Sequence, residues 1–223
     1  MKRVPMKSVP LWGVVAAVWM LLPLAASAQF GRSTAPTYRG VWNPSVGAGA
    51  AYEVTQKDGT KTNMEMAIVG KESIDGKDAY WFEVTMDSAR GSMIMKSLSV
   101  RNDQDMSVSR MIMQLPGRPP MEMPTQMMQS RAEKQPADIR QLADEVGAES
   151  VTTPAGTFDT IHYQMKDGSG DAWVAAKVGP YGMVKFQGKD NTMVLTKVIS
   201  DAKDKITGTP QPFNPMAMGG QRQ

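Results

Sequence analysis

The chain has 223 residues, of which 41% are hydrophobic and 21% are charged, and it contains no cysteine. This length is enough to bury a core or enclose a small ligand, and the lack of cysteine excludes disulfide frameworks, thiol catalysis and cysteine-ligated metal sites. Because His162 is the single histidine, imidazole-rich metal sites and most histidine-dependent acid–base chemistry are not expected.

The first 28 residues are predicted to be a cleavable secretory signal. Three basic residues precede the apolar stretch 11–25, which is short for a membrane span, and the small residues 26–28 favour cleavage after Ala28. We therefore expect a secreted or periplasmic protein. An N-terminal anchor that is not cleaved is the alternative.

The charge balance of the mature chain argues against nucleic acid as a partner. Three of the 25 basic residues lie in the signal, so cleavage leaves 22 basic and 22 acidic residues. These charges are scattered and mixed in sign, whereas a nucleic-acid binder is expected to cluster its lysines and arginines. Nucleic-acid binding is excluded.

Residues 29–49 are rich in Gly, Pro, Ser and Thr and are predicted to be a flexible linker. From residue 50 onward, short segments rich in β-branched, aromatic and methionine residues alternate with turns. Asp58-Gly59 and Asp75-Gly76 favour tight hairpins, because a type I′ turn needs positive φ at both central positions. The predicted antiparallel strands are 51–56, 62–69, 79–86, 93–101 and 106–115.

Residues 116–147 are predicted to be a Pro-rich and helical insertion between two blocks of strands. Ile139, Leu142, Ala143 and Val146 fall at helical spacing, which predicts one amphipathic helix. Gly147 would then be the C′ residue of this helix.

Strand patterns return after the insertion. The second set of predicted strands is 150–153, 158–166, 172–176, 183–188 and 192–200. Residues 202–223 have little apolar content and are predicted to be a disordered tail.

The pattern predicts a mainly β (α+β) fold over residues 50–201. We expect a strongly curved antiparallel sheet or half-barrel of about ten strands, because larger flat sheets tend to curl. Several strands are apolar on both faces, which indicates that the helical and Pro-rich insertion covers the concave side. A solid sandwich without a cavity is the alternative.

Methionine is unusually abundant, with 20 residues. Since side chains alternate faces along a strand, a Met-x-Met pair places two thioethers on one face. Such pairs are consistent with core filling, with a deformable wall for an apolar ligand, or with soft-metal binding. The five pairs are Met64/Met66, Met93/Met95, Met111/Met113, Met121/Met123 and Met216/Met218.

We expect a non-enzymatic domain that binds or carries an apolar, lipid-like ligand in a concavity lined by methionine and aromatic side chains. One alternative is a periplasmic protein that sequesters Cu(I) or Ag(I), and another is a structural envelope-interaction module without a ligand. A peripheral envelope or protein partner is also consistent with the sequence. The candidate ligand-binding residues are Met64, Met66, Tyr80, Phe82, Met93, Met95, Met111, Met113 and Trp173.

No catalytic residue, metal ligand or cofactor is predicted. His162 is expected to face solvent from a strand, with no acid at a spacing that would orient it. Gly168-Ser169-Gly170 lacks both the nucleophile-elbow pattern and a following helix, and is interpreted as a hairpin turn.

The second block of strands resembles the outer-membrane lipoprotein carrier superfamily. The resemblance lies in the segment 153–158, in Ala172-Trp173-Val174, in the segment 182–185, and in a Lys-Asp hairpin that leads into 192–198. It implies an unclosed, strongly curved antiparallel sheet that wraps a helical lid and binds acyl chains. No functional residue is carried over by a motif.

Overall fold

The computed structural model describes residues 40–213, except 90, 103–104, 125–134 and 137. The chain divides into two units, Met1–Thr37 and Tyr38–Gln223, and the described residues belong to the second. The predicted signal 1–28, the first part of the predicted linker and the end of the predicted tail lie outside the described residues.

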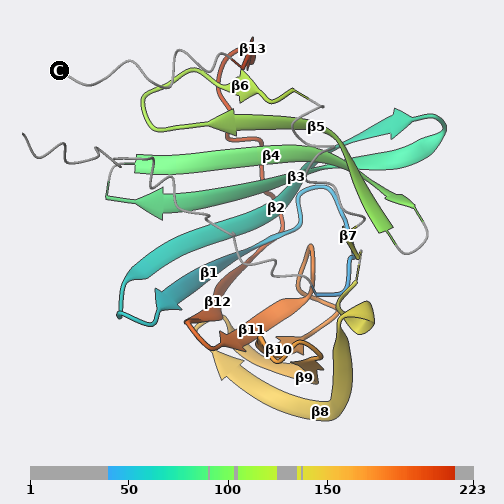
Figure 1. The fold of residues 1–223 in the computed structure, drawn as a ribbon, viewed down its shortest axis with the longest axis vertical. Helices are drawn as coiled ribbons and strands as arrows, with labels where there is room; N and C mark the ends of the chain where they lie inside the picture. The colour runs from blue at the N-terminus through green and yellow to red at the C-terminus, as the bar shows by residue number, and fades with distance from the viewer. Residues whose placement is uncertain (1–39, 90, 103–104, 125–134, 137, 214–223) are drawn as a thin grey trace, which may run out of the picture. The chain divides into compact units, whose positions relative to one another are not determined.

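The described residues contain thirteen strands and one short 3₁₀ helix (Figure 1). The elements are β1 (Gly49–Gln56), β2 (Lys61–Ile74), β3 (Lys77–Ser88), β4 (Gly91–Asn102), β5 (Asp105–Gln114), β6 (Met121–Glu122), β7 (Gln135–Pro136), η1 (Ile139–Gln141), β8 (Ala143–Thr153), β9 (Gly156–Met165), β10 (Gly170–Val174), β11 (Met183–Gly188), β12 (Asn191–Ile199) and β13 (Gln211–Pro212).

All strands belong to one open sheet with the order β13-β6-β5-β4-β3-β2-β1-β12-β11-β10-β9-β8, and β7 pairs with β5. Strands β1 to β5 form successive antiparallel hairpins, as predicted, and so do β8 to β12. The two blocks are joined where β12 pairs with β1. Asp75 and Gly76 have φ values of 49° and 75°, so the β2–β3 turn has the positive φ values that the sequence predicted.

The sheet curves so that its two halves share one hydrophobic core (Figure 1). The core unites Tyr52 and Ile68 of the first block with Tyr163, Val174 and Leu195 of the second. The strand β8 also contacts β11 and β12, which are not its neighbours in the sheet. The predicted curved, mainly β fold is therefore confirmed, and the sheet is not a closed barrel.

The predicted helix over 139–146 is wrong. Only Ile139–Gln141 is helical, and β8 begins at Ala143. Ile139 is 1% exposed whereas Val146 is 59% exposed, so the four apolar residues do not form one buried stripe. Gly147 lies at a register shift between β8 and β9 instead of at a helix end. Backbone pairing with β9 thus overrides a local pattern that is only two turns long.

The strands β6 and β7 of the insertion 116–147 lie beside β5 at one edge of the sheet. β6 pairs with the end of β5, and β7 pairs with its beginning. These two strands extend the sheet instead of covering its concave face, whereas Ile139 and Ala143 of the same insertion pack into the core. Residues 125–134 and 137 lie outside the described residues.

Two segments without a strong structural pattern in the sequence pack onto the sheet. In the predicted linker, Trp42 is 6% exposed and belongs to the core. In the predicted tail, residues 202–213 run along the outer face, where Ile206 packs on a second, smaller core cluster with Trp81 and Leu98. Gln211 ends this path by pairing in parallel with Met121. Both segments are held in place by contacts with residues far away in the sequence. Composition alone does not reveal such contacts.

Candidate functional site

Eight of the nine predicted ligand-binding residues lie on one face of the sheet. Directly opposed residues on neighbouring strands share a face, and the register opposes Met64 to Met86 and Met86 to Met93. It likewise opposes Met95 to Met113. This shared face is the concave one, because Met64 and Met66 belong to the core that joins the two halves of the sheet.

Four of these eight residues pack into the core on the concave side of the sheet, which we call the trough, instead of lining an open space. They are Met64, Met66, Tyr80 and Phe82. Met64 and Met66 are 6% and 5% exposed. Phe82 packs edge to face on Tyr181 with ring centroids 5.4 Å apart, and Trp42 lies 4.9 Å from Tyr181 and 6.4 Å from Tyr80. The predicted concavity is therefore partly occupied by an aromatic cluster. Trp42 was missed as a member because its segment was assigned to the linker.

The other four, Met93, Met95, Met111 and Met113, are only half-buried. They lie on β4 and β5 beside the core, and neither core cluster includes them. A contiguous group of apolar side chains that stays accessible to solvent can serve as a binding surface. We call this part of the sheet the methionine face.

Two further methionines extend the methionine face. Met121 on β6 lies opposite Met113, and the Met123 amide donates to the Met111 carbonyl at 2.9 Å. The sequence marked Met121 and Met123 as a Met-x-Met pair but placed them in a loop. The alternation of methionine with Glu122 was the signal that could have assigned them to a strand.

Trp173 does not lie on the concave face, and its assignment as a wall residue is corrected. Its neighbours Ala172 and Val174 point into the core, so the indole points outward. There it stacks on His162, with centroids 4.6 Å apart, and lies 4.4 Å from the Lys185 ammonium. The indole Nε1 donates to Glu149 Oε2 at 2.7 Å.

His162 is partly buried in this outer cluster, with a side chain that is 19% exposed. Its Nε2 lies 2.9 Å from Asp171 Oδ1, and its Nδ1 lies 3.8 Å from Glu149 Oε2. Strand pairing, not sequence spacing, supplies these two acids.

The outer face of the first block carries a buried group of charges under the C-terminal segment. Glu83 is 2% exposed, and its Oε2 accepts from the Lys205 amide at 3.2 Å. Burial raises the pKa of Glu83 to about 7, and the neighbouring Asp204 carboxyl adds to this rise. The pKa of Asp204 is lowered overall. Burial acts to raise it, but the ion pair with Lys96 and the hydrogen bond from the Ile206 amide outweigh the effect of burial.

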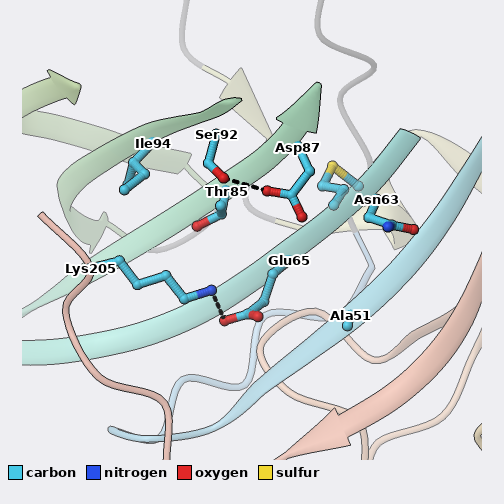
Figure 2. A pocket seen from close by; sticks show the side chains of 9 residues that line it. Ala51, Asn63, Glu65, Thr85, Asp87, Ser92, Ile94 and Lys205 are labelled. Carbon is cyan, nitrogen blue, oxygen red and sulfur yellow. Dashed lines mark hydrogen bonds and ion pairs between the residues drawn. The ribbon is translucent and has the colours of Figure 1, made fainter. Parts of the chain in front are cut away.

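A small pocket, most of whose lining residues are polar, lies beside this segment (Figure 2). Its volume is about 240 Å³, below the ~300–1,000 Å³ typical of small-molecule sites. Lys205 pairs with Glu65 at 2.6 Å, and Ser92 donates to Asp87 at 2.6 Å, so polar groups on its rim already have partners. This pocket is therefore too small for a lipid-like ligand. Its lining residues are Ala51, Asn63, Met64, Glu65, Thr85, Asp87, Ser92, Ile94 and Lys205.

Within the described part of the chain, no group of three His, Cys, Asp or Glu residues is arranged to hold a metal ion. Among the same residues, no helix has the length and apolar character needed to cross a membrane.

Neither the protein-family models nor the curated proteins give a match to this chain. Several solved structures are similar over most of it. A chain described as an exported protein with a YmcC-like fold, from Bacteroides fragilis, is 13% identical with a TM-score of 0.38, and the match covers 72% of this chain and 99% of that one. A chain described as a lipoprotein, from Parabacteroides distasonis, is 13% identical with a TM-score of 0.36 and coverages of 72% and 98%.

The MucA/MucB complex of Pseudomonas aeruginosa is also similar, at 9% identity and a TM-score of 0.37, with coverages of 73% of this chain and 56% of the matched one. Similarity this low establishes neither a family nor a function for the protein. The resemblance to the outer-membrane lipoprotein carrier superfamily therefore stays a prediction.

Proposed function

We propose that this protein is a secreted or periplasmic, non-enzymatic domain that binds an apolar, lipid-like ligand on the methionine face. One observation carries the proposal: Met93, Met95, Met111 and Met113 stay partly exposed on a contiguous part of the concave face, outside both core clusters. Methionines that served only as core filler would be buried, as Met183 and Met193 are, with 1% and 0% exposure.

The ligand would lie on an open surface next to the aromatic cluster, because Trp42, Phe82 and Tyr181 occupy the deeper part of the trough. Each methylene of an acyl chain that is fully buried against the methionine face would contribute about 0.8 kcal/mol. Methionine suits this role because its unbranched, polarisable side chain repacks around ligands of different shapes.

Native mass spectrometry of the mature protein purified together with cell envelope tests the proposal. We expect a co-purifying apolar adduct. The variant Met93→Gln/Met95→Gln/Met111→Gln/Met113→Gln should lose the adduct, because the face becomes polar. The corresponding four Met→Leu substitutions are the matched control and should keep it. Absence of any adduct on the wild-type protein, or equal retention by the glutamine variant, would contradict the proposal.

A structural envelope-interaction module without a small ligand is the second candidate. The aromatic cluster that occupies the trough favours it. Under this alternative the partner is a peripheral envelope component or a protein, and purified protein carries no adduct although its methionine face remains intact.

A further inference from the structure

Three of the Met-x-Met pairs meet on adjacent strands of the methionine face. Met93 and Met95 lie on β4, Met111 and Met113 on β5, and the third pair begins on β6 with Met121. The register opposes Met95 to Met113 and Met113 to Met121. Three thioether side chains thus stand in one row across three neighbouring strands.

The spacing of this row allows the three sulfur atoms to converge. The Cβ atoms of directly opposed residues lie about 4.5–5.5 Å apart, and the methionine side chain has three rotatable bonds that let its sulfur reach toward a neighbour. Met113 is in the middle, so Met95 and Met121 can lean toward it from either side. Met121 is 7% exposed while Met95 and Met113 are half-buried, which gives the row one sheltered end and one accessible side.

The donor chemistry selects one class of ion. Thioethers are soft, uncharged ligands that favour soft metals, whereas hard cations require carboxylate and carbonyl oxygens. Glu122 lies between two methionines in the sequence, but it points to the opposite face and pairs with Arg110 at 2.8 Å. The row is therefore built from sulfur, with no carboxylate among the three side chains.

We propose that Met95, Met113 and Met121 form a three-thioether site for a soft monovalent metal ion, Cu(I) or Ag(I). Met93, Met111 and Met123 flank the site and supply alternative thioethers. The ion keeps its charge on binding, and each sulfur donates a lone pair without losing a proton. The proposal rests on the strand register and does not depend on a lipid-like ligand.

Competition titration of the mature protein tests the site. One sample is titrated with Ag(I), which needs no reductant. A separate sample is titrated anaerobically with Cu(I) in competition with a chromogenic chelator. We expect one ion per chain with an affinity tighter than micromolar. X-ray absorption of the Cu(I) form should show sulfur ligands alone. A micromolar or weaker affinity, or nitrogen and oxygen ligands, would overturn the proposal.

Leucine substitutions test which thioethers hold the ion. Met95→Leu/Met113→Leu removes two thioethers but keeps the face apolar. It should weaken Ag(I) binding by roughly tenfold or more, since the loss of mere supporting partners already costs that much. Met64→Leu/Met66→Leu, another Met-x-Met pair but in the core, is the matched control. Equal weakening by both variants would overturn the site.

Discussion

Replacing Glu83 with glutamine should make the protein more stable at alkaline pH. The Glu83 carboxyl is buried between the sheet and the C-terminal segment, beside Asp204 and near Lys96. Lys205 contributes its backbone amide to Glu83, while its ammonium pairs with Glu65. Glutamine can still accept from the amide and can donate to Asp204, so the substitution removes the ionisation of Glu83 while keeping its hydrogen bonds.

The sign and size of the effect follow from the pKa of Glu83. This pKa is 4.5 in the absence of the fold and about 7 within it, so the folded protein binds more protons between these values. Stability is therefore greatest below the unfolded pKa, decreases as pH rises, and levels off above the folded pKa. From pH 5 to pH 8 the decrease is about 2–3 kcal/mol, which corresponds to a change in Tm of about 5–10 °C for a domain of this size.

Thermal unfolding of the wild type and Glu83→Gln between pH 5 and pH 8 measures this difference. The two proteins should unfold at similar temperatures at pH 5 and diverge as the pH rises, with the variant more stable. Glu122→Gln is a control of opposite sign, because the Arg110 guanidinium lowers the pKa of Glu122. It should reduce stability near neutral pH and have no effect at acidic pH, once wild-type Glu122 is protonated. Parallel profiles for the wild type and Glu83→Gln would refute the reasoning.

Two further predictions concern the core. Gly182→Ala should destabilise the protein by about 2 kcal/mol or more, because Gly182 has a φ of 73° and a Cβ would lie 2.7 Å from Val174 Cγ1. Gly117→Ala is the control, because Gly117 also has a positive φ but a Cβ there would meet open space. This control should lose only about 1 kcal/mol of stability. Tyr52→Phe should lose about 1–2 kcal/mol, because the buried hydroxyl donates to the Met183 carbonyl at 3.1 Å. Urea denaturation measures the free energy of unfolding of each variant, and an unchanged m-value shows that the loss is one of stability.

The sequence predicted the strands and most of the concave face because hairpins make face assignment a local matter. Alternation alone placed Met93 with Met95 and Met111 with Met113, and the register confirms that these pairs share one face. Adjacent hairpins then align the pairs without any long-range contact, so the central part of the methionine face could be predicted from the residues.

The errors arose where pairing over long distances decides the structure. Trp173 is flanked by apolar residues on both sides, so alternation did not tell which face it takes; its partners Glu149, His162 and Lys185 come from three other strands. Residues 139–146 have a helical pattern that is too short to resist pairing with β9.

Polar composition likewise hid the order of the C-terminal segment. Residues 202–213 contain few apolar side chains, yet Asp204 pairs with Lys96 and the Lys205 amide bonds to Glu83. These two partners, Lys96 and Glu83, lie more than a hundred residues earlier in the chain. No local pattern could have revealed them.

Methionine-methyl NMR tests most directly whether the methionine face binds the ligand. The protein is labelled with ¹³C at the methionine methyl groups and titrated with a single-chain lysolipid below its critical micelle concentration. The account predicts that the Met93, Met95, Met111 and Met113 signals shift and saturate together, while those of the buried Met183 and Met193 stay in place. Unchanged signals from the four face residues, or shifts of equal size at all six methionines, would contradict it.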